Sequence, residues 1–367
     1  MPEEITEEDE RSFFKIISTK LSDEQLQRVS IPPETYPKEH SVLAIHWHPE
    51  FVPMDTIRKR IDTTFPEQEN SLIIPTQHNV LMQYDNFYGA EVDCYSRQFN
   101  QKVQLLLHFN QNRLERAETL KSMLDYTFTY RSSQLYDFMD TILKPVEGRM
   151  KIAARETGAD TMLVHLVTVY VGKIKKLLET HENKVPPEMI KNKLLRNFFD
   201  TLREKYGHGL INRAQAFLKA VKTLVKAEFP LPYFYRTEEI IEEARSIGAG
   251  VVVPHPEQFW PILLAEYDID GFEVWNPQSR KYTEFLISVI DKHNKRIGLS
   301  RRKLLIFMGD DTHMGEKVKD PIHQDEAKAS REIGVQPAWK DLHIRKKLIL
   351  AKMQKDDVIN EYRERLT

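Results

Sequence analysis

The chain has 367 residues, 41% of them hydrophobic, with 53 lysines and arginines against 55 aspartates and glutamates and a formal net charge of -2. This length gives either two domains or one large barrel with a sizeable core, and the balanced charge does not require a polyanionic partner. A single cysteine, Cys94, excludes an internal disulfide framework. No apolar run is long enough to span a bilayer and no secretory segment is evident, so we expect a soluble cytoplasmic protein with no membrane partner.

Residues 1–40 are predicted to form an N-terminal extension of two short helices. Thr6 and Ser22 suit the N-cap positions, and Ser22 with Gln25 has the spacing of a capping box. Prolines between residues 32 and 37 then end any helix.

Four runs with the character of strands follow in close succession, at residues 42–48, 71–78, 90–96 and 103–109. The link after the first run has room for a helix. The links after the second and third are too short for a helical crossover, which needs about a dozen residues. We therefore expect the third and fourth runs to form a hairpin-like, partly antiparallel insertion.

Residues 111–229 are predicted to be a long helical insertion. Apolar residues recur there at helical spacing, which indicates about five helices near 112–129, 133–155, 159–181, 187–206 and 210–227. Gly158 and Gly207 fall where two of these helices should end. No fixed repeat period is present.

Strand-like runs return at residues 250–255, 271–276 and 304–310, separated by helical patterns at 237–247, 259–267 and 282–293. This alternation is typical of parallel strands joined by helices. Residues 321–367 are predicted to be a C-terminal helical tail of two helices. Its basic cluster at 345–355 is interpreted as a solvated helix face.

Histidines and carboxylates stand on or just after every one of these strand-like runs. His46 and His48 are two residues apart, so both would project from the same face of a strand, about 7 Å apart. The C-terminal ends of parallel barrel strands meet at one mouth, where such side chains would form a metal site with several ligands. Each residue alone has an ordinary structural explanation, and the hypothesis depends on the set. The remaining members are His78, Glu91, His108, His255, Glu273, Asp311 and His313.

The order of these motifs resembles the PHP (polymerase and histidinol phosphatase) family. The shared features are the His-x-His start, the later His and Gly-x-Glu, the His-Pro after an apolar strand, and the final Asp-x-His. The resemblance implies an α/β fold, a distorted (β/α)7 TIM-like barrel formed by residues 41–110 and 230–320, and a metal-dependent phosphoesterase with two or three divalent ions. It implies as metal ligands His46, His48, His78, Glu91, His108, His255, Asp311 and His313. Glu273 matches a strand motif for which ligation is not assumed.

One part of the family pattern is missing. The His-x-His motif is usually followed by a Ser-rich turn with a metal-binding aspartate, whereas this chain reads Pro-Glu-Phe-Val-Pro at residues 49–53. Glu50 and Asp55 are the candidates to replace that aspartate.

These residues suggest hydrolysis of a phosphate ester, with a metal-activated hydroxide attacking phosphorus at the barrel mouth. Imidazole and carboxylate ligands suit zinc, manganese or iron. Glu91 would join two ions, and Asp311 or His313 would handle the proton. Arg280 and Arg97 would bind the substrate and offset phosphoryl charge. The expected substrate is a phosphorylated small molecule, a phosphomonoester.

Three alternatives stay open. A nuclease or phosphodiesterase could use the same site, with bases stacked on aromatic residues, although the balanced charge makes nucleic acid the less favoured partner. The stacking candidates are Trp47, Tyr95, Phe109 and Trp275. A hydrolase of carbon–nitrogen or carboxylic ester bonds would usually place a lysine at a strand end, and none stands there. The chain could also be a non-catalytic metal-binding interaction module. Substrate identity and oligomeric state are open.

Overall fold

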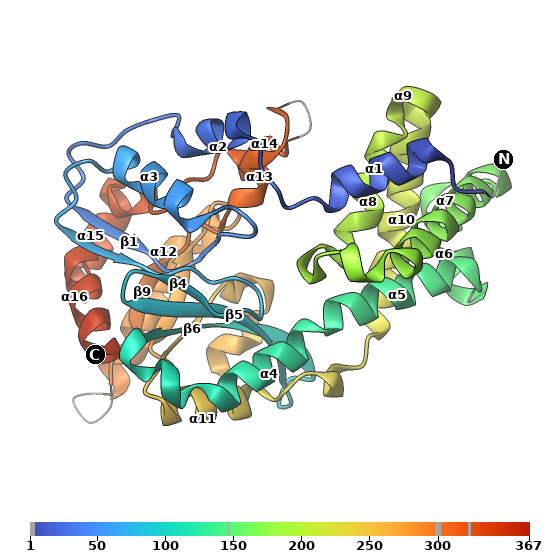
Figure 1. Cartoon of the computed structure of the whole chain (residues 1–367). Coiled ribbons are helices and arrows are strands. Elements are labelled where there is room, and N and C mark those ends of the chain that lie inside the picture. The colour runs from blue at the N-terminus through green and yellow to red at the C-terminus, as the bar shows by residue number, and fades with distance from the viewer. Residues whose placement is uncertain (1–3, 146, 298–301, 322–323) are drawn as a thin grey trace. The chain divides into compact units, whose positions relative to one another are not determined.

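The structure, a computed structural model, describes residues 4–145, 147–297, 302–321 and 324–367 (Figure 1). The chain separates into two compact units. We call the first the helical unit, which comprises Met1–Lys20 and Thr129–Pro230. We call the second the site unit, which comprises Leu21–Phe128 and Leu231–Thr367. The predicted N-terminal extension is thus divided, because residues 1–20 belong to the helical unit and the following residues belong to the site unit.

The site unit is built around a six-stranded sheet in the order β4-β5-β6-β7-β8-β9. Neighbouring strands from β4 to β7 are antiparallel, and β7, β8 and β9 are parallel. The antiparallel hairpin and the later parallel strands confirm the two expectations drawn from link length and alternation. The strands are β4 Met82–Tyr84, β5 Phe87–Ser96, β6 Gln101–Asn110, β7 Gly250–Val253, β8 Gly271–Trp275 and β9 Leu305–Met308.

Two short parallel pairs complete the strands of the site unit. β1 (Ser41–Ala44) pairs with β3 (Asn70–Ile73), and β2 (Trp47–His48) pairs with β10 (Thr312–His313). A single bridge between His78 and Glu91 links the segment after β3 to β5. The fold is therefore mixed α/β with a central sheet, and the ladders of the described strands do not join into a closed barrel.

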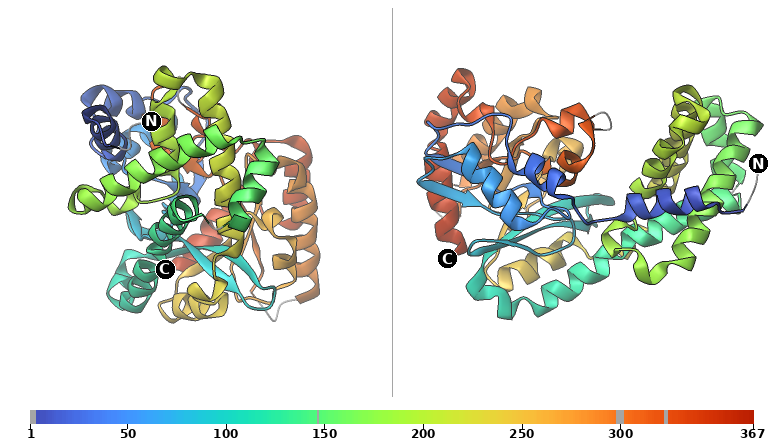
Figure 2. Two further views of the ribbon diagram at one scale, coloured as in Figure 1. Left: turned by 90° about the vertical axis from the view of Figure 1, so that its right-hand side faces the viewer. Right: turned by 45° about the horizontal axis from the view of Figure 1, so that its top comes forward.

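Helices cover this sheet, and some come from the predicted C-terminal tail. α4 and α11 pack against each other and against β5 (Figures 1 and 2). α16 packs against β1, β3, β6, β7 and β9, and its Tyr362 is fully buried. The tail is thus part of the site unit. The helices of the site unit are α2 Asp23–Ser30, α3 Met54–Thr64, α4 Glu118–Phe128, α11 Thr237–Ser246, α12 Thr283–Ile297, α13 Met314–Val318, α14 Glu326–Ala329, α15 Leu342–Ala351 and α16 Lys355–Leu366.

Short 3-10 helices make several of the connections. The predicted helix at 259–267 is one of them, since only the short stretch η6 (Trp260–Leu264) is helical there. The others in the site unit are η1 Gln111–Arg116, η4 Leu231–Tyr233, η5 Pro256–Gln258, η7 Arg280–Tyr282 and η9 Pro337–Trp339. The helical unit adds η2 Glu182–Lys184 and η3 Pro187–Met189.

The helical unit has its own apolar core, which includes Phe198, Phe199 and Phe217. One helix predicted over 133–155 is in fact two, since Pro145 lies between α5 and α6 and cannot continue a helix. The predicted caps at Thr6 and Ser22 are confirmed, and both form capping boxes. The helices of this unit are α1 Glu7–Ile17, α5 Tyr130–Leu143, α6 Glu147–Thr157, α7 Thr161–Thr180, α8 Lys193–Thr201, α9 Arg203–Tyr206 and α10 His208–Glu228.

The chain leaves the site unit after α4 and returns to it beside η4. Tyr126 of α4 and Tyr233 of η4 are stacked, with ring centroids 5.1 Å apart and planes at 18°. The two ends of the interruption therefore lie next to each other within the site unit. Among the described residues, no helix combines the length and apolarity needed to cross a bilayer.

Candidate metal centre

The His46–Trp47–His48 segment forms the buried base of the site. It follows the apolar strand β1, whose Val42, Leu43 and Ala44 are fully buried. The side chains of His46 and His48 are only 1% and 0% exposed, and their ring centroids lie 5.5 Å apart. The alternation of strand residues thus brings both imidazoles to one centre, with Trp47 packed into the core on the opposite side.

Five further predicted residues converge on the same centre. His78 Nδ1 lies 2.7 Å from Glu91 Oε2, and His48 Nε2 lies 3.6 Å from that oxygen. Asp311 Oδ1 lies 3.4 Å from the Nε2 atoms of both His48 and His313. Ligand atoms within 4.8 Å of one another form three groups, which are His48, His78 and His313; His46, His48 and Asp311; and His46, Glu91 and His255.

Several buried atoms of this cluster have no hydrogen-bond partner. They are His46 Nε2, both ring nitrogens of His48, His78 Nδ1 and Glu91 Oε2. The short contact between His78 and Glu91 lacks hydrogen-bond geometry, as expected of two ligands that face a common centre. A buried polar atom without a partner costs about 1–3 kcal/mol. Divalent cations would pair with these atoms, so the donor set fits zinc, manganese or iron.

The charges of the cluster suit metal binding as well. Burial acts to raise the pKa of Glu91, but the facing His78 and His48 hold it well below its usual value. Burial likewise opposes ionisation of Asp311, yet its contacts with His313 and His48 hold its pKa well below normal. Burial and the neighbouring His313 and His78 lower the pKa of His48 to about 3. Ionised carboxylates and the neutral imidazole of His48 are the protonation states that metal ligands require. His46 and His313 instead have raised pKa values, because burial is outweighed by the facing carboxylates, and they would release a proton on binding a metal.

A layer of side chains behind the ligands fixes their orientation. Glu273 Oε2 lies 2.9 Å from His46 Nδ1. Burial acts to lower the pKa of His46, but this carboxylate has the larger effect and raises the pKa to about 10. Asn276 Nδ2 donates to Glu273 Oε1 at 3.0 Å and lies 3.3 Å from His255 Nδ1. A Cβ at Gly309 would lie 2.1 Å from Glu273 Oε1, so only glycine fits there. Glu273 is thus a support for His46 rather than a ligand in this arrangement.

Arg331 was not identified from the sequence. Its guanidinium donates to Asp311 Oδ2 at 2.6 Å and to the Asp311 carbonyl at 3.0 Å, and its side chain is 4% exposed. Asp311 has a left-handed backbone with φ of 49°, a conformation that costs a non-glycine residue free energy. Arg331 therefore holds both the carboxylate and the strained backbone of Asp311. It lies in a charged segment without a motif, so no pattern indicated it.

The turn after His48 supplies a further carboxylate. Glu50 Oε1 lies 3.7 Å from His313 Nδ1, and a Cβ at Gly315 would lie 2.1 Å from Glu50 Oε2. Asp55 is exposed in the first turn of α3. Of the two candidates for the missing aspartate, Glu50 is the one that reaches the cluster.

His108 lies away from the ligands, which contradicts its predicted role. Its Nδ1 lies 2.7 Å from the Tyr362 hydroxyl and its Nε2 lies 3.0 Å from the Ile45 carbonyl, so neither nitrogen is available to a metal. The reason is strand direction. β6 is antiparallel to β7, and His108 pairs with Gly250 at the start of β7, so the end of β6 lies opposite the mouth.

The predicted substrate arginines and stacking aromatics are not assembled around the cluster. Arg280 is exposed with its guanidinium 6.0 Å from the Trp275 ring centroid, and Arg97 is exposed in the turn after β5. No contact joins either arginine to the cluster among the described residues. Tyr95 is half-buried, while Trp47, Phe109 and Trp275 are buried in the core and cannot stack on a base.

Comparisons with known proteins do not assign the chain to a family. No protein-family model matches the chain, and no curated protein matches it in sequence. The structure is similar to that of a protein from Bifidobacterium adolescentis provisionally described as a metal-dependent phosphoesterase. The two chains are 16% identical, with a TM-score of 0.46, and the match covers 90% of this chain and 98% of the other. The functional conclusion therefore depends on the side chains of the site.

Proposed function

We propose that this protein is a metal-dependent hydrolase of phosphate esters that acts at the cluster around His48. The observation that carries the proposal is the set of buried, unpartnered ligand atoms on His46, His48 and Glu91. No internal hydrogen bond compensates them, and divalent cations would. Phosphate ester hydrolysis is the chemistry that a close set of such ions serves well, because the ions neutralise phosphoryl charge and activate water.

The exposure of the ligands indicates where a substrate would bind. His46 and His48 are fully buried, whereas the side chains of His78 and His313 are 23% and 25% exposed. The phosphoryl group would therefore approach from the side of His78 and His313. Asp311 lies between His48 and His313, and its Oδ1 faces both imidazoles while Oδ2 stays paired with Arg331, so Oδ1 is the oxygen open to a metal.

The arrangement of the strands is compatible with a distorted seven-stranded barrel that holds the cluster. β2 pairs with β10, the bridge from His78 to Glu91 joins the next segment to β5, and the six-stranded sheet runs from β5 to β9. In such an arrangement β1 and β2 would act as one interrupted strand, and so would β9 and β10. The PHP-like barrel remains a proposal that these links support.

The test is turnover of p-nitrophenyl phosphate by protein loaded with Mn²⁺ or Zn²⁺, before and after treatment with a chelator. We expect activity that chelation removes and metal restores, and that His46→Ala and His48→Ala each abolish. His343→Ala is the matched control, because His343 is exposed on α15. Full activity of the His48→Ala variant would refute the proposal. Metal binding without turnover of mono- or diester substrates would favour the non-catalytic alternative.

A further inference from the structure

The balanced charge of the whole chain conceals a strong segregation. The segment from residue 129 to 230 has 18 lysines and arginines against 11 aspartates and glutamates, a net of +7. Residues 1–20 of the same unit have six acidic and three basic residues, so the helical unit as a whole has a net charge of +4 and the site unit -6. A basic segment in an acidic protein is typical of a surface that attracts a polyanion. The total charge of the chain therefore does not exclude nucleic acid as a partner of this segment.

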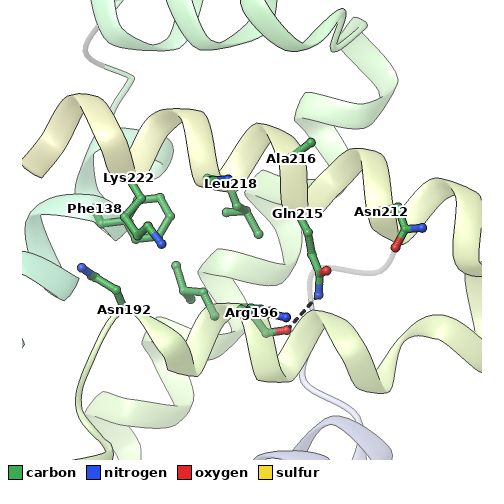
Figure 3. Close-up of a pocket in the computed structure, with 10 residues that line it drawn as sticks. Phe138, Asn192, Arg196, Asn212, Gln215, Ala216, Leu218 and Lys222 are labelled. Carbon is green, nitrogen blue, oxygen red and sulfur yellow. Dashed lines mark hydrogen bonds between the residues drawn. The ribbon is translucent and has the colours of Figure 1, made fainter. Parts of the chain in front are cut away.

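A cavity of about 480 Å³ lies in this segment, between α8 and α10 (Figure 3). Leu195 of α8 and Leu218 of α10 line it together with Phe138 of α5, and all three are buried in the core of the helical unit. The cavity therefore has an apolar floor. Its volume is in the range that holds one drug-sized molecule or one nucleotide, about 300–1,000 Å³.

Cations line the cavity and carboxylates do not. Arg196, Lys219 and Lys222 contribute to the wall, and the lining residues of the described chain include no aspartate or glutamate. Arg196 and Lys219 are exposed and form no ion pair among the described residues. The nearby Asp200 is already neutralised by Arg203 at 2.8 Å. Arg196 and Lys219 thus present positive charge to the cavity without an ion-pair partner in the described part of the chain.

The residues of α10 that line the cavity lie on one face of the helix. They are Asn212, Gln215, Lys219 and Lys222, at spacings of three and four residues. Two of them are cations, and with Arg196 of α8 they place three positive charges at the cavity, which suits an anion with repeated charges.

One amide oxygen beside the apolar floor is open to a further hydrogen bond. It is not that of Gln215, whose Nε2 donates to the Arg196 carbonyl at 3.2 Å and to Asp200 and whose Oε1 accepts from Arg203 (Figure 3). Asn192 Nδ2 donates to Gln134 at 2.6 Å, while the buried Asn192 Oδ1 has no partner. A ligand with an N–H donor would satisfy this oxygen.

We propose that the groove between α8 and α10 binds single-stranded nucleic acid. Arg196 and Lys219 bind phosphates, the apolar floor receives one unstacked base, and the Oδ1 atom of Asn192 accepts a hydrogen bond from the edge of that base. A duplex keeps its bases paired and offers only its backbone, so it would not fill the cavity. The binding does not require hydrolysis at the metal centre, and it can be measured separately.

The experiment uses the full-length protein with a chelator present, so that no metal-dependent cleavage occurs. Binding of a fluorescein-labelled 12-nucleotide DNA strand of mixed sequence is followed by anisotropy from 50 to 200 mM salt. We expect the double variant Arg196→Glu/Lys219→Glu to bind at least about tenfold more weakly at 50 mM salt. For this variant, the slope of log affinity against log salt concentration should be less negative by about 1.4, since two phosphate contacts are lost.

The matched control is Arg155→Glu/Lys176→Glu. Both residues are exposed cations of the same unit, on α6 and α7, and neither lines the cavity. The control removes the same charge from the unit, so it should lose much less affinity than the groove variant. Thermal unfolding of both variants checks that the unit stays folded, and Arg196→Lys/Lys219→Arg should retain binding.

Two results would overturn the proposal. The first is absence of strand binding by the wild-type protein at 50 mM salt, or an equal loss in the groove and control variants. The second is binding of a 12-base-pair duplex, or of ATP alone, as tight as that of the strand. Strand binding that survives chelation while p-nitrophenyl phosphate is never hydrolysed would support this groove and count only against the phosphoesterase proposal.

Discussion

Glu273 Oε2 and His46 Nδ1 lie 2.9 Å apart, although the two residues are separated by more than 220 positions in the chain. Both side chains are buried, and this contact leaves Nε2 as the nitrogen of His46 that faces the other ligands. The contact therefore decides both the orientation of the imidazole and which of its nitrogens can bind a metal.

We expect Glu273→Gln to weaken metal binding by about 10- to 100-fold, because the variant keeps the size of the side chain but loses the charge that orients His46. The measurement is competition for Zn²⁺ with a chelating dye. Glu242→Gln, on the exposed side of α11, is the control and should not change the affinity. Equal affinities for the wild type and Glu273→Gln would show that His46 does not depend on this carboxylate.

We expect Arg331→Met to lower the turnover of p-nitrophenyl phosphate by about 10- to 100-fold, because Asp311 would lose the guanidinium that fixes its carboxylate. Arg331→Lys should recover part of the loss, since a lysine restores the charge but not both hydrogen bonds. The exposed Arg345→Met variant is the control. If turnover fell only in proportion to the folded fraction, Arg331 would be a purely structural residue.

His108→Ala should retain full metal content per folded molecule, in contrast to His48→Ala. The variant should unfold more easily by about 1–3 kcal/mol, because the Tyr362 hydroxyl and the Ile45 carbonyl would lose a buried partner. Elemental analysis and urea denaturation measure the two quantities. Loss of metal from folded His108→Ala protein would restore His108 to the ligand set.

The stability of the metal-free protein should fall in acid partly through His108. Burial lowers the pKa of His108 to about 3, whereas the unfolded chain has its usual value of 6.5. The unfolded state therefore takes up a proton below pH 6.5 that the folded state does not. The contribution is fully present above pH 6.5 and is lost as the pH falls towards 3, at about 1.4 kcal/mol per pH unit.

Urea denaturation of chelated protein between pH 7 and pH 5 measures this slope. For His108→Gln, the slope of the unfolding free energy against pH should correspond to about one proton fewer taken up on unfolding. The exposed His343→Gln variant should leave this slope unchanged. Parallel slopes for the wild type and His108→Gln would mean that His108 titrates normally in the folded protein.

The sequence predicted most of the residues that the structure brings together in the cluster, because they follow or occupy short apolar strands. His46, His48 and Glu91 are examples. It did not predict Arg331, since a supporting arginine needs only a contact and no fixed spacing. The prediction for His108 was wrong, because strand direction decides at which end of the sheet a terminal residue lies, and the antiparallel direction of β6 places His108 away from the cluster.

Two further differences have similar causes. The single helix predicted over 133–155 is broken because Pro145 weighs more than a continuous apolar periodicity. The total charge of the chain does not reveal the basic character of the helical segment, because it averages over regions of opposite sign. In both cases a local property, the proline or the charge of one segment, was decisive. The apolar periodicity and the total charge, which average over a longer stretch, were misleading.

The stacked rings of Tyr126 and Tyr233 hold together the two points between which the helical segment is inserted. A short loop could join those points and leave every proposed metal ligand on the chain that remains, since the ligands precede residue 126 or follow residue 233. Residues 1–20 share the apolar core of this segment, so the helical unit could be removed only if both segments were removed together, and the proposed ligands would then all remain.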